Sequence, residues 1–126
     1  MNIALWIVQV LLAIAFGMAG AMKVLRSPDE LTAQSENMAW TKEVPAPLVK
    51  FIGISEVAGA FGLLLPAITG IAVDLVSLAG IGLAVVMILA SIFHFTRKEY
   101  PAIAINMVLL ALAIFVAYGR IELAVL

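Results

Sequence analysis

The sequence predicts an all-α, polytopic membrane protein: a bundle of four transmembrane helices with a short interfacial helix between helices 1 and 2. Of its 126 residues, 65% are hydrophobic and 12% are charged, against about 45–50% and about 25% in soluble domains. The mean hydropathy is +1.20. The apolar residues form four runs near the length of about 20 residues that spans a bilayer. These runs are too continuous for β-barrel strands. We expect one membrane domain over residues 1–126.

The first two predicted spans cover about 3–25 and 48–65. The first has no charge before Lys23, and its long apolar run and lack of a basic leader favour a retained helix over a cleaved signal peptide. The second contains a single acid, Glu56, and we expect Pro66 to end it.

The last two predicted spans cover about 69–95 and 102–118. His94 lies near the end of the third, and Asn106 is the one strongly polar residue of the fourth. A helical bundle is the expected architecture, because backbone groups in lipid must be hydrogen-bonded internally.

The one sizeable polar stretch predicts an interfacial helix at about 28–41. Ser27 is a typical N-cap, Pro28 suits the first helical position, and acids follow. A break at residues 45–47 separates this helix from the second span. Its apolar side chains are expected to rest on the membrane surface: Leu31, Met38 and Trp40.

Basic residues predict the orientation in the membrane. One side of the bundle has six of them: Lys23, Arg26, Lys42, Lys50, Arg97 and Lys98. The other side has Arg120 and the amino terminus. The positive-inside rule therefore places links 1–2 and 3–4 in the cytoplasm and both termini outside.

Small residues recur at helical spacing in every span and predict the contact faces, because they allow close backbone approach in lipid. They are Ala13, Gly17 and Gly20; Gly53, Gly59 and Ala60; Gly80 and Ala84; and Ala113 and Ala117. Polar residues fall on the same faces. Four of them lie in the predicted cytoplasmic half and are expected to meet in one pocket: Lys23, Glu56, His94 and Asn106. Gln9 and Asp74 fall in the opposite half.

Glu56 is the strongest candidate for function, because a carboxyl group about 12 Å deep in a membrane is costly. We assign proton exchange to Glu56 and His94. The candidate ligand-binding set is Lys23, Glu56, His94, Arg97 and Asn106. The alternative is a structural Lys23–Glu56 ion pair.

Composition excludes several kinds of centre. The chain has no cysteine and one histidine, so it cannot form disulfides, iron–sulfur clusters or a bis-histidine haem by itself. It carries no flavin motif, and no spacing predicts a metal site. A net charge of −1 gives no basic face for nucleic acid.

Several segments resemble the DoxX-like family of small four-helix bacterial membrane proteins. They are residues 20–24, residues 51–66, residues 94–99 and Asn106. The resemblance implies a bacterial inner-membrane location and adds Glu99 to the polar positions above. It also implies a link to redox chemistry, since the founding members look like subunits of an enzyme that passes electrons from thiosulfate to quinone. Other relatives look tied to oxidative-stress complexes or membrane-protein assembly. Asp74 lies outside the family pattern.

Three functions stay open at this level. The first is a redox-associated protein that binds quinone, or a similar amphipathic molecule, and receives electrons from a partner protein or a substrate. On this reading the chain is an oxidoreductase or a subunit of one. The second is a non-catalytic accessory or assembly subunit of a larger membrane complex. The third is a minimal proton-coupled transporter. The sequence indicates no oligomeric state.

Overall fold

The fold is helical throughout the part of the chain that the structure, a computed structural model, describes: residues 2–34 and 36–122. Four helices are long and apolar enough to cross a membrane, which confirms the predicted fold class. In chain order the elements are α1 (Asn2–Leu25), α2 (Pro28–Gln34), the 3₁₀ helix η1 (Glu36–Lys42), α3 (Ala46–Thr69), α4 (Asp74–Thr96) and α5 (Tyr100–Glu122).

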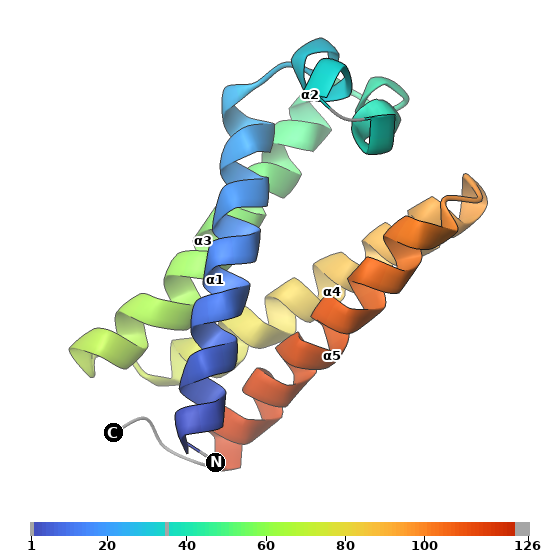
Figure 1. Cartoon of the computed structure of the whole chain (residues 1–126). Helices are drawn as coiled ribbons and strands as arrows, with labels where there is room; N and C mark the ends of the chain where they lie inside the picture. The colour runs from blue at the N-terminus through green and yellow to red at the C-terminus, as the bar shows by residue number, and fades with distance from the viewer. Residues whose placement is uncertain (1, 35, 123–126) are drawn as a thin grey trace.

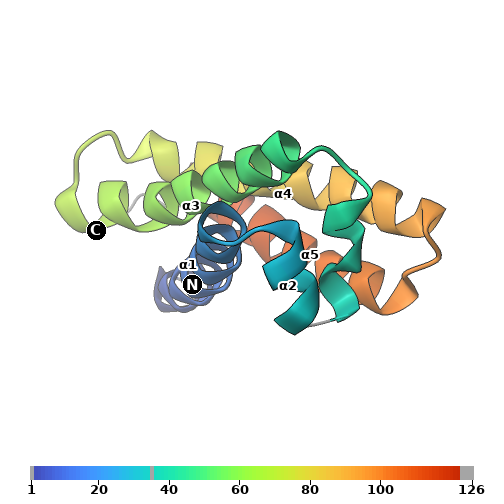
Figure 2. The ribbon, with the colours of Figure 1, turned by 90° about the horizontal axis from the view of Figure 1, so that it is seen from above.

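The four long helices form two pairs arranged as a V. Helix α1 packs along α3, and α4 packs along α5. The two pairs meet at the end that carries the amino terminus and diverge toward the other end (Figure 1). Helices α2 and η1 lie at this wide end, where the view from above places them on the same side as the α4–α5 loop (Figure 2).

Two glycines set the contact between α1 and α3. A Cβ atom on Gly20 would lie 2.6 Å from the carbonyl oxygen of Gly53, and one on Gly53 would lie 2.7 Å from that of Gly20. Both distances are far below van der Waals contact, so the two backbones touch only because neither residue has a side chain. This contact brings Lys23, one turn beyond Gly20, close to Glu56, which lies one turn beyond Gly53.

The core lies along the faces that small residues predicted. On α4 every third or fourth residue is buried: Ser77, Gly80, Ala84, Met87, Ser91 and His94. Ala13, Ala60, Ala113 and Ala117 are buried on the other three helices. Large side chains fill the space between them, with Phe16, Leu63, Leu83 and Val116 at most 1% exposed. The predicted inward faces are therefore confirmed.

A polar network joins three helices at the narrow end of the V. Arg120 Nε donates to Gln9 Oε1 at 2.6 Å, and Arg120 Nη1 donates to Asn2 Oδ1 at 2.6 Å. Gln9 Nε2 in turn donates to the Leu63 carbonyl oxygen at 2.7 Å. Arg120 is 7% exposed and lies over the ring of Trp6. The network thus fastens α5 to α1 and α1 to α3.

The prediction that Pro66 ends the second span is wrong. Helix α3 continues through Pro66 to Thr69, and Gly70 ends it in the left-handed conformation, with its N–H donating to the Pro66 carbonyl. An interior proline removes one N–H from the helical ladder and crowds the carbonyl of the residue four positions earlier. The turn that follows Pro66 is buried through Ala67, and this packing keeps the helix intact. The same element begins earlier than predicted, because Pro47 falls in its first turn.

The segment between α1 and α3 begins as predicted but ends differently. Ser27 caps α2: its Oγ accepts from the Glu30 N–H at 3.2 Å, and Glu30 Oε1 accepts from the Ser27 N–H. This reciprocal pair is a capping box. The expectation that Leu31 and Trp40 rest on the membrane surface is wrong. They are 0% and 9% exposed and pack with Val49 of α3, because burial against the open end of the bundle removes more apolar surface from water.

Candidate ligand-binding pocket

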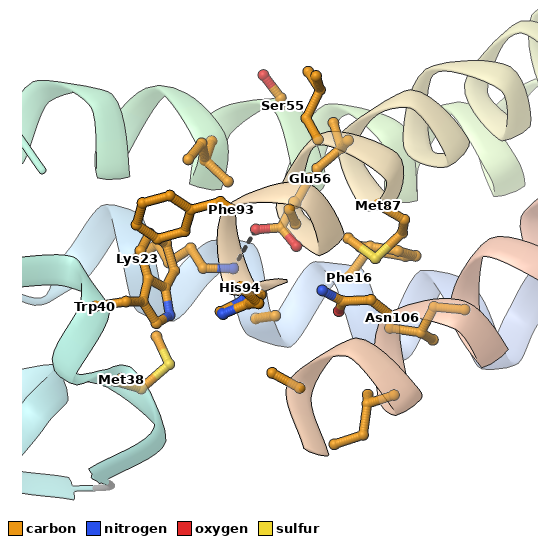
Figure 3. A pocket seen from close by; sticks show the side chains of 18 of the residues that line it. Phe16, Lys23, Met38, Trp40, Ser55, Glu56, Met87, Phe93, His94 and Asn106 are labelled. Carbon is orange, nitrogen blue, oxygen red and sulfur yellow. Dashed lines mark hydrogen bonds and ion pairs between the residues drawn. The ribbon is translucent and has the colours of Figure 1, made fainter. Parts of the chain in front are cut away.

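A pocket of about 580 Å³ occupies the wide end of the V. All four long helices and η1 contribute to its lining. Lys23, Glu56, His94 and Asn106 come from α1, α3, α4 and α5 and turn toward the same space (Figure 3). The predicted convergence of these four residues is therefore a feature of the fold. The rest of the wall is mostly apolar, and the volume lies within the range of about 300–1,000 Å³ typical of small-molecule sites.

Lys23 and Glu56 form a buried ion pair at one wall of the pocket. Lys23 Nζ lies 2.5 Å from Glu56 Oε1, and their side chains are 12% and 3% exposed. The close contact of Gly20 and Gly53 fixes this geometry. Two opposite charges in contact neutralise each other, which lowers the cost of placing either one inside the membrane. The pair is thus a structural contact that also faces the cavity.

Aromatic rings surround the ion pair. The Trp40 ring of η1 lies 6.0 Å from Lys23 Nζ, within the range of a cation–π interaction. Its centroid is 5.8 Å from that of Phe93 and 5.9 Å from that of His94, in edge-to-face geometry. Trp40 thus joins the ion pair to α4, a role that the sequence did not reveal.

His94 is held by the turn that ends α4. Lys98 adopts the left-handed conformation, the Glu99 N–H donates to the His94 carbonyl at 2.9 Å, and the Lys98 N–H donates to the Phe95 carbonyl at 3.1 Å. This pattern is a Schellman motif. The motif reverses the chain direction, so that the Glu99 side chain lies beside His94. His94 Nδ1 is 2.9 Å from Glu99 Oε1. The backbone turn therefore sets the orientation of the imidazole ring.

Arg97 completes this contact from outside the pocket. Its Nε donates to Glu99 Oε1 at 2.9 Å, while its Nη1 lies 3.9 Å from Glu43. Partial burial raises the pKa of Glu99, but hydrogen bonds from His94 and Arg97 and the Arg97 charge outweigh it, so this pKa lies below its ordinary value. Arg97, predicted to bind ligand, does not line the cavity. It contacts two neighbours of the cavity: Glu99, which binds His94, and the lining residue Phe93, whose ring centroid lies 5.9 Å from the Arg97 guanidinium carbon.

Asn106 brings an unused donor to the pocket. Its amide nitrogen, Nδ2, is buried and has no hydrogen-bond partner among the described residues. A buried donor without an acceptor costs about 1–3 kcal/mol, and Asn106 lines the cavity. Ser91 Oγ is also buried and unpartnered, but Ser91 is not part of the lining. Among the described residues, Asn106 is therefore the lining residue that carries a buried polar group without a partner.

Other polar residues lie apart from this site. Asp74 is exposed at the start of α4, and Gln9 belongs to the network at the narrow end. Arg120 was missed as a buried residue, although it continues the stripe of Ala113 and Ala117 at helical spacing. Among the described residues, no group of three or more His, Asp or Glu side chains is placed to hold a metal ion.

The fold and the pocket define a small polytopic membrane protein: a four-helix bundle with a mostly apolar cavity, to whose wall each of the four long helices contributes at least one polar residue. The chain belongs to the DoxX-like family, whose model matches residues 7–116. This match spans every residue that lines the pocket. No curated protein and no solved structure matches the chain.

Proposed function

We propose that the protein is a redox-associated membrane protein that binds a quinone, or a similar amphipathic molecule with a polar head, in the pocket at the wide end of the V. The observation that supports this most directly is the unpartnered Asn106 Nδ2 at the wall of a ligand-sized, mostly apolar cavity. A carbonyl or hydroxyl oxygen of the ligand would accept its hydrogen bond. The apolar remainder of the wall suits a ring and tail.

The ion pair and His94 supply the proton chemistry that a quinone needs. Reduction of a quinone to its quinol takes up two electrons and two protons, and both Glu56 and His94 line the cavity. The contact of His94 with Glu99, a side chain 25% exposed, links the pocket to the aqueous side. In this proposal Glu56 and His94 exchange protons, Lys23 and Asn106 orient the head group, and Arg97 acts through Glu99. Electrons come from a partner protein or a substrate.

We further propose that the wide end faces the cytoplasm of a bacterial cell, with the protein in the inner membrane. Lys42, Lys50 and Lys98 are exposed at this end. Arg120, the basic residue near the narrow end, is buried in the bundle. Among the described residues, the exposed lysines therefore lie at one end, as the positive-inside rule expects of the cytoplasmic face.

The experiment measures quinone that co-purifies with the protein in lipid nanodiscs, extracted and quantified against phospholipid. We expect wild type to retain quinone above the lipid background and Asn106→Leu to lose it, because the change removes the pocket amide and keeps a side chain of similar volume. Ser91→Ala is the matched control, since it deletes a buried unpartnered oxygen outside the lining. It should retain quinone.

A second arm adds ubiquinone and menaquinone to quinone-free nanodiscs and follows binding by calorimetry. Glu56→Gln should weaken binding in the folded fraction, which circular dichroism monitors. Wild-type protein that neither co-purifies with nor binds either quinone would overturn the proposal. Equal retention by wild type and Asn106→Leu would remove Asn106 from the site.

A further inference from the structure

Apolar side chains border the pocket on the side of the segment that joins α1 to α3. Leu31, Trp40 and Val49 form a buried cluster there, with Met38, Ile52 and Phe93 packed against it. Met38 and Trp40 themselves form part of the pocket wall. The segment that contains them lies at the wide end in both overall views (Figures 1 and 2). A bulky solute from water would have to displace this cluster to enter.

The wall between α1 and α5 is built differently. At the narrow end these helices touch, because Leu5 fills the space beside Gly119 and Arg120 binds Gln9. Toward the wide end they diverge, and the pocket lies between them. The residues that line it there include three alanines, Ala15, Ala19 and Ala102.

These alanines lie at the bilayer-facing surface of the bundle. Ala15 is exposed, Ala19 and Ala102 are partly exposed, and the neighbouring lining residue Ile105 is 61% exposed. On the opposite side, between α3 and α4, the exposed lining residues are bulky: Leu48, Phe51 and Leu89. Two further lining residues there, Ser55 and Ala90, are small and partly exposed. Helices α1 and α5 diverge toward the wide end and carry the three alanines, and we call the opening between them the slot.

We infer that the pocket takes its ligand sideways from the bilayer, through the slot between α1 and α5, and that the ligand carries a long apolar tail that stays in this slot. The inference rests on the proposed function for the identity of the head group. It adds the class of ligand, a lipid-soluble molecule with a single unbranched or prenyl tail. It also assigns different routes to the ligand and to the protons. The ligand enters from the bilayer through the slot, whereas protons reach its head group through His94 and Glu99.

The slot has a direct test in the fluorescence of Trp40. In a Trp6→Phe background Trp40 is the single tryptophan, and the probe is a nanodisc of phosphatidylcholine brominated in the middle of one acyl chain. Chains that enter the slot should quench Trp40, although the residue itself is 9% exposed. Ala19→Phe and, independently, Ala15→Phe should fill the slot and reduce quenching at least twofold.

The matched control is Met18→Phe, because Met18 is 64% exposed and does not line the pocket. It should leave the quenching unchanged. Quenching that is absent in the parent, or unchanged by both slot variants, would overturn the lateral route whatever the head group is.

The tail is tested with two quinones that share one head group: the dimethoxy-methyl benzoquinone ring without a tail, and decylubiquinone. Affinities are expressed per mole of lipid, so that partitioning cancels. Ala19→Phe should weaken binding of decylubiquinone by roughly tenfold, as expected for lost burial of about two methylene groups, and should weaken binding of the tailless ring by much less. Equal affinity of wild type for both molecules would overturn the tail requirement. Binding of neither, with intact quenching by brominated lipid, would instead overturn the quinone proposal.

Discussion

Arg120 Nε and Gln9 Oε1 lie 2.6 Å apart, although 111 residues separate them in the sequence. This contact joins the last turn of α5 to the first half of α1 and lies at the point where the two arms of the V meet. The Arg120 guanidinium also benefits from its position at a helix carboxyl end, where the helix dipole favours positive charge. The narrow end is thus fastened by hydrogen bonds, while the wide end is held apart around the pocket.

Removal of Arg120 is expected to loosen the narrow end. Arg120→Met leaves Gln9 Oε1 and Asn2 Oδ1 without their donor, so the free energy of unfolding in mixed micelles should fall by about 1–3 kcal/mol. Gln9→Leu added to Arg120→Met should cost less than the sum of the two single changes, because both break one network. Ile121→Ala, at a side chain 65% exposed, is the control. Additive effects would show that the network is not a unit.

The Lys23–Glu56 pair predicts an asymmetry between single and double substitutions. Lys23→Met or Glu56→Leu alone leaves one buried charge without its partner, and each should lower the free energy of unfolding by about 3–5 kcal/mol. The double variant Lys23→Met/Glu56→Leu replaces the pair by apolar groups and should recover most of that loss. The measurement is thermal unfolding followed by circular dichroism.

The same double variant separates structure from ligand binding. Our proposal expects it to fold and yet to bind quinone more weakly than wild type. A folded double variant with wild-type affinity would make the ion pair purely structural. A double variant less stable than both single variants would contradict the predicted recovery.

The contacts of Glu99 are expected to make the folded protein less stable in acid. Its pKa in the folded protein lies below the ordinary value of 4.5, so its contacts stabilise the fold at any pH above that value. The contribution disappears as the pH falls from 4.5 through the folded-state pKa, because protonation removes the charge that His94 and Arg97 contact. The wild-type melting temperature minus that of Glu99→Gln should therefore be positive at pH 7 and shrink below pH 4.5. A difference that is constant with pH would refute this role.

Any side chain at position 53 is expected to clash with the backbone of α1. Gly53→Ala would place a Cβ atom 2.7 Å from the Gly20 carbonyl oxygen, so α1 and α3 must separate and the Lys23–Glu56 contact must lengthen. We expect a clear fall in melting temperature and weaker ligand binding. Gly82→Ala is the matched control, because a Cβ atom there meets nothing within 4 Å. It should be neutral or stabilise the helix by about 0.5–1 kcal/mol. Equal effects of the two changes would rule out the close approach as the cause.

The sequence correctly predicted the burial of residues that lie in a long helix with small residues at regular helical spacing. His94 continues the regular spacing of Gly80 and Ala84 on α4, so its inward direction followed from helix geometry. Leu31 and Trp40 had no such periodicity, because they belong to two short elements: Leu31 to the seven-residue α2, and Trp40 to the 3₁₀ helix η1. Their burial depends on the open end of the bundle, which is a property of the whole fold. Pro66 was misplaced because a local helix-breaking preference yielded to the packing of the turn that follows it.

The sequence by itself determined that this chain is a four-span helical membrane protein and which face of each helix turns inward. It also determined that Lys23, Glu56, His94 and Asn106 share one half of the bundle. These properties follow from hydrophobicity, periodicity and rise per residue, which are local. Only the tertiary structure decided that the helices pair into a V, that Lys23 contacts Glu56 while a cavity remains beside them, and that Arg120 closes the opposite end. These depend on contacts between residues far apart in the chain, where the fit of particular side chains sets the distances between helices.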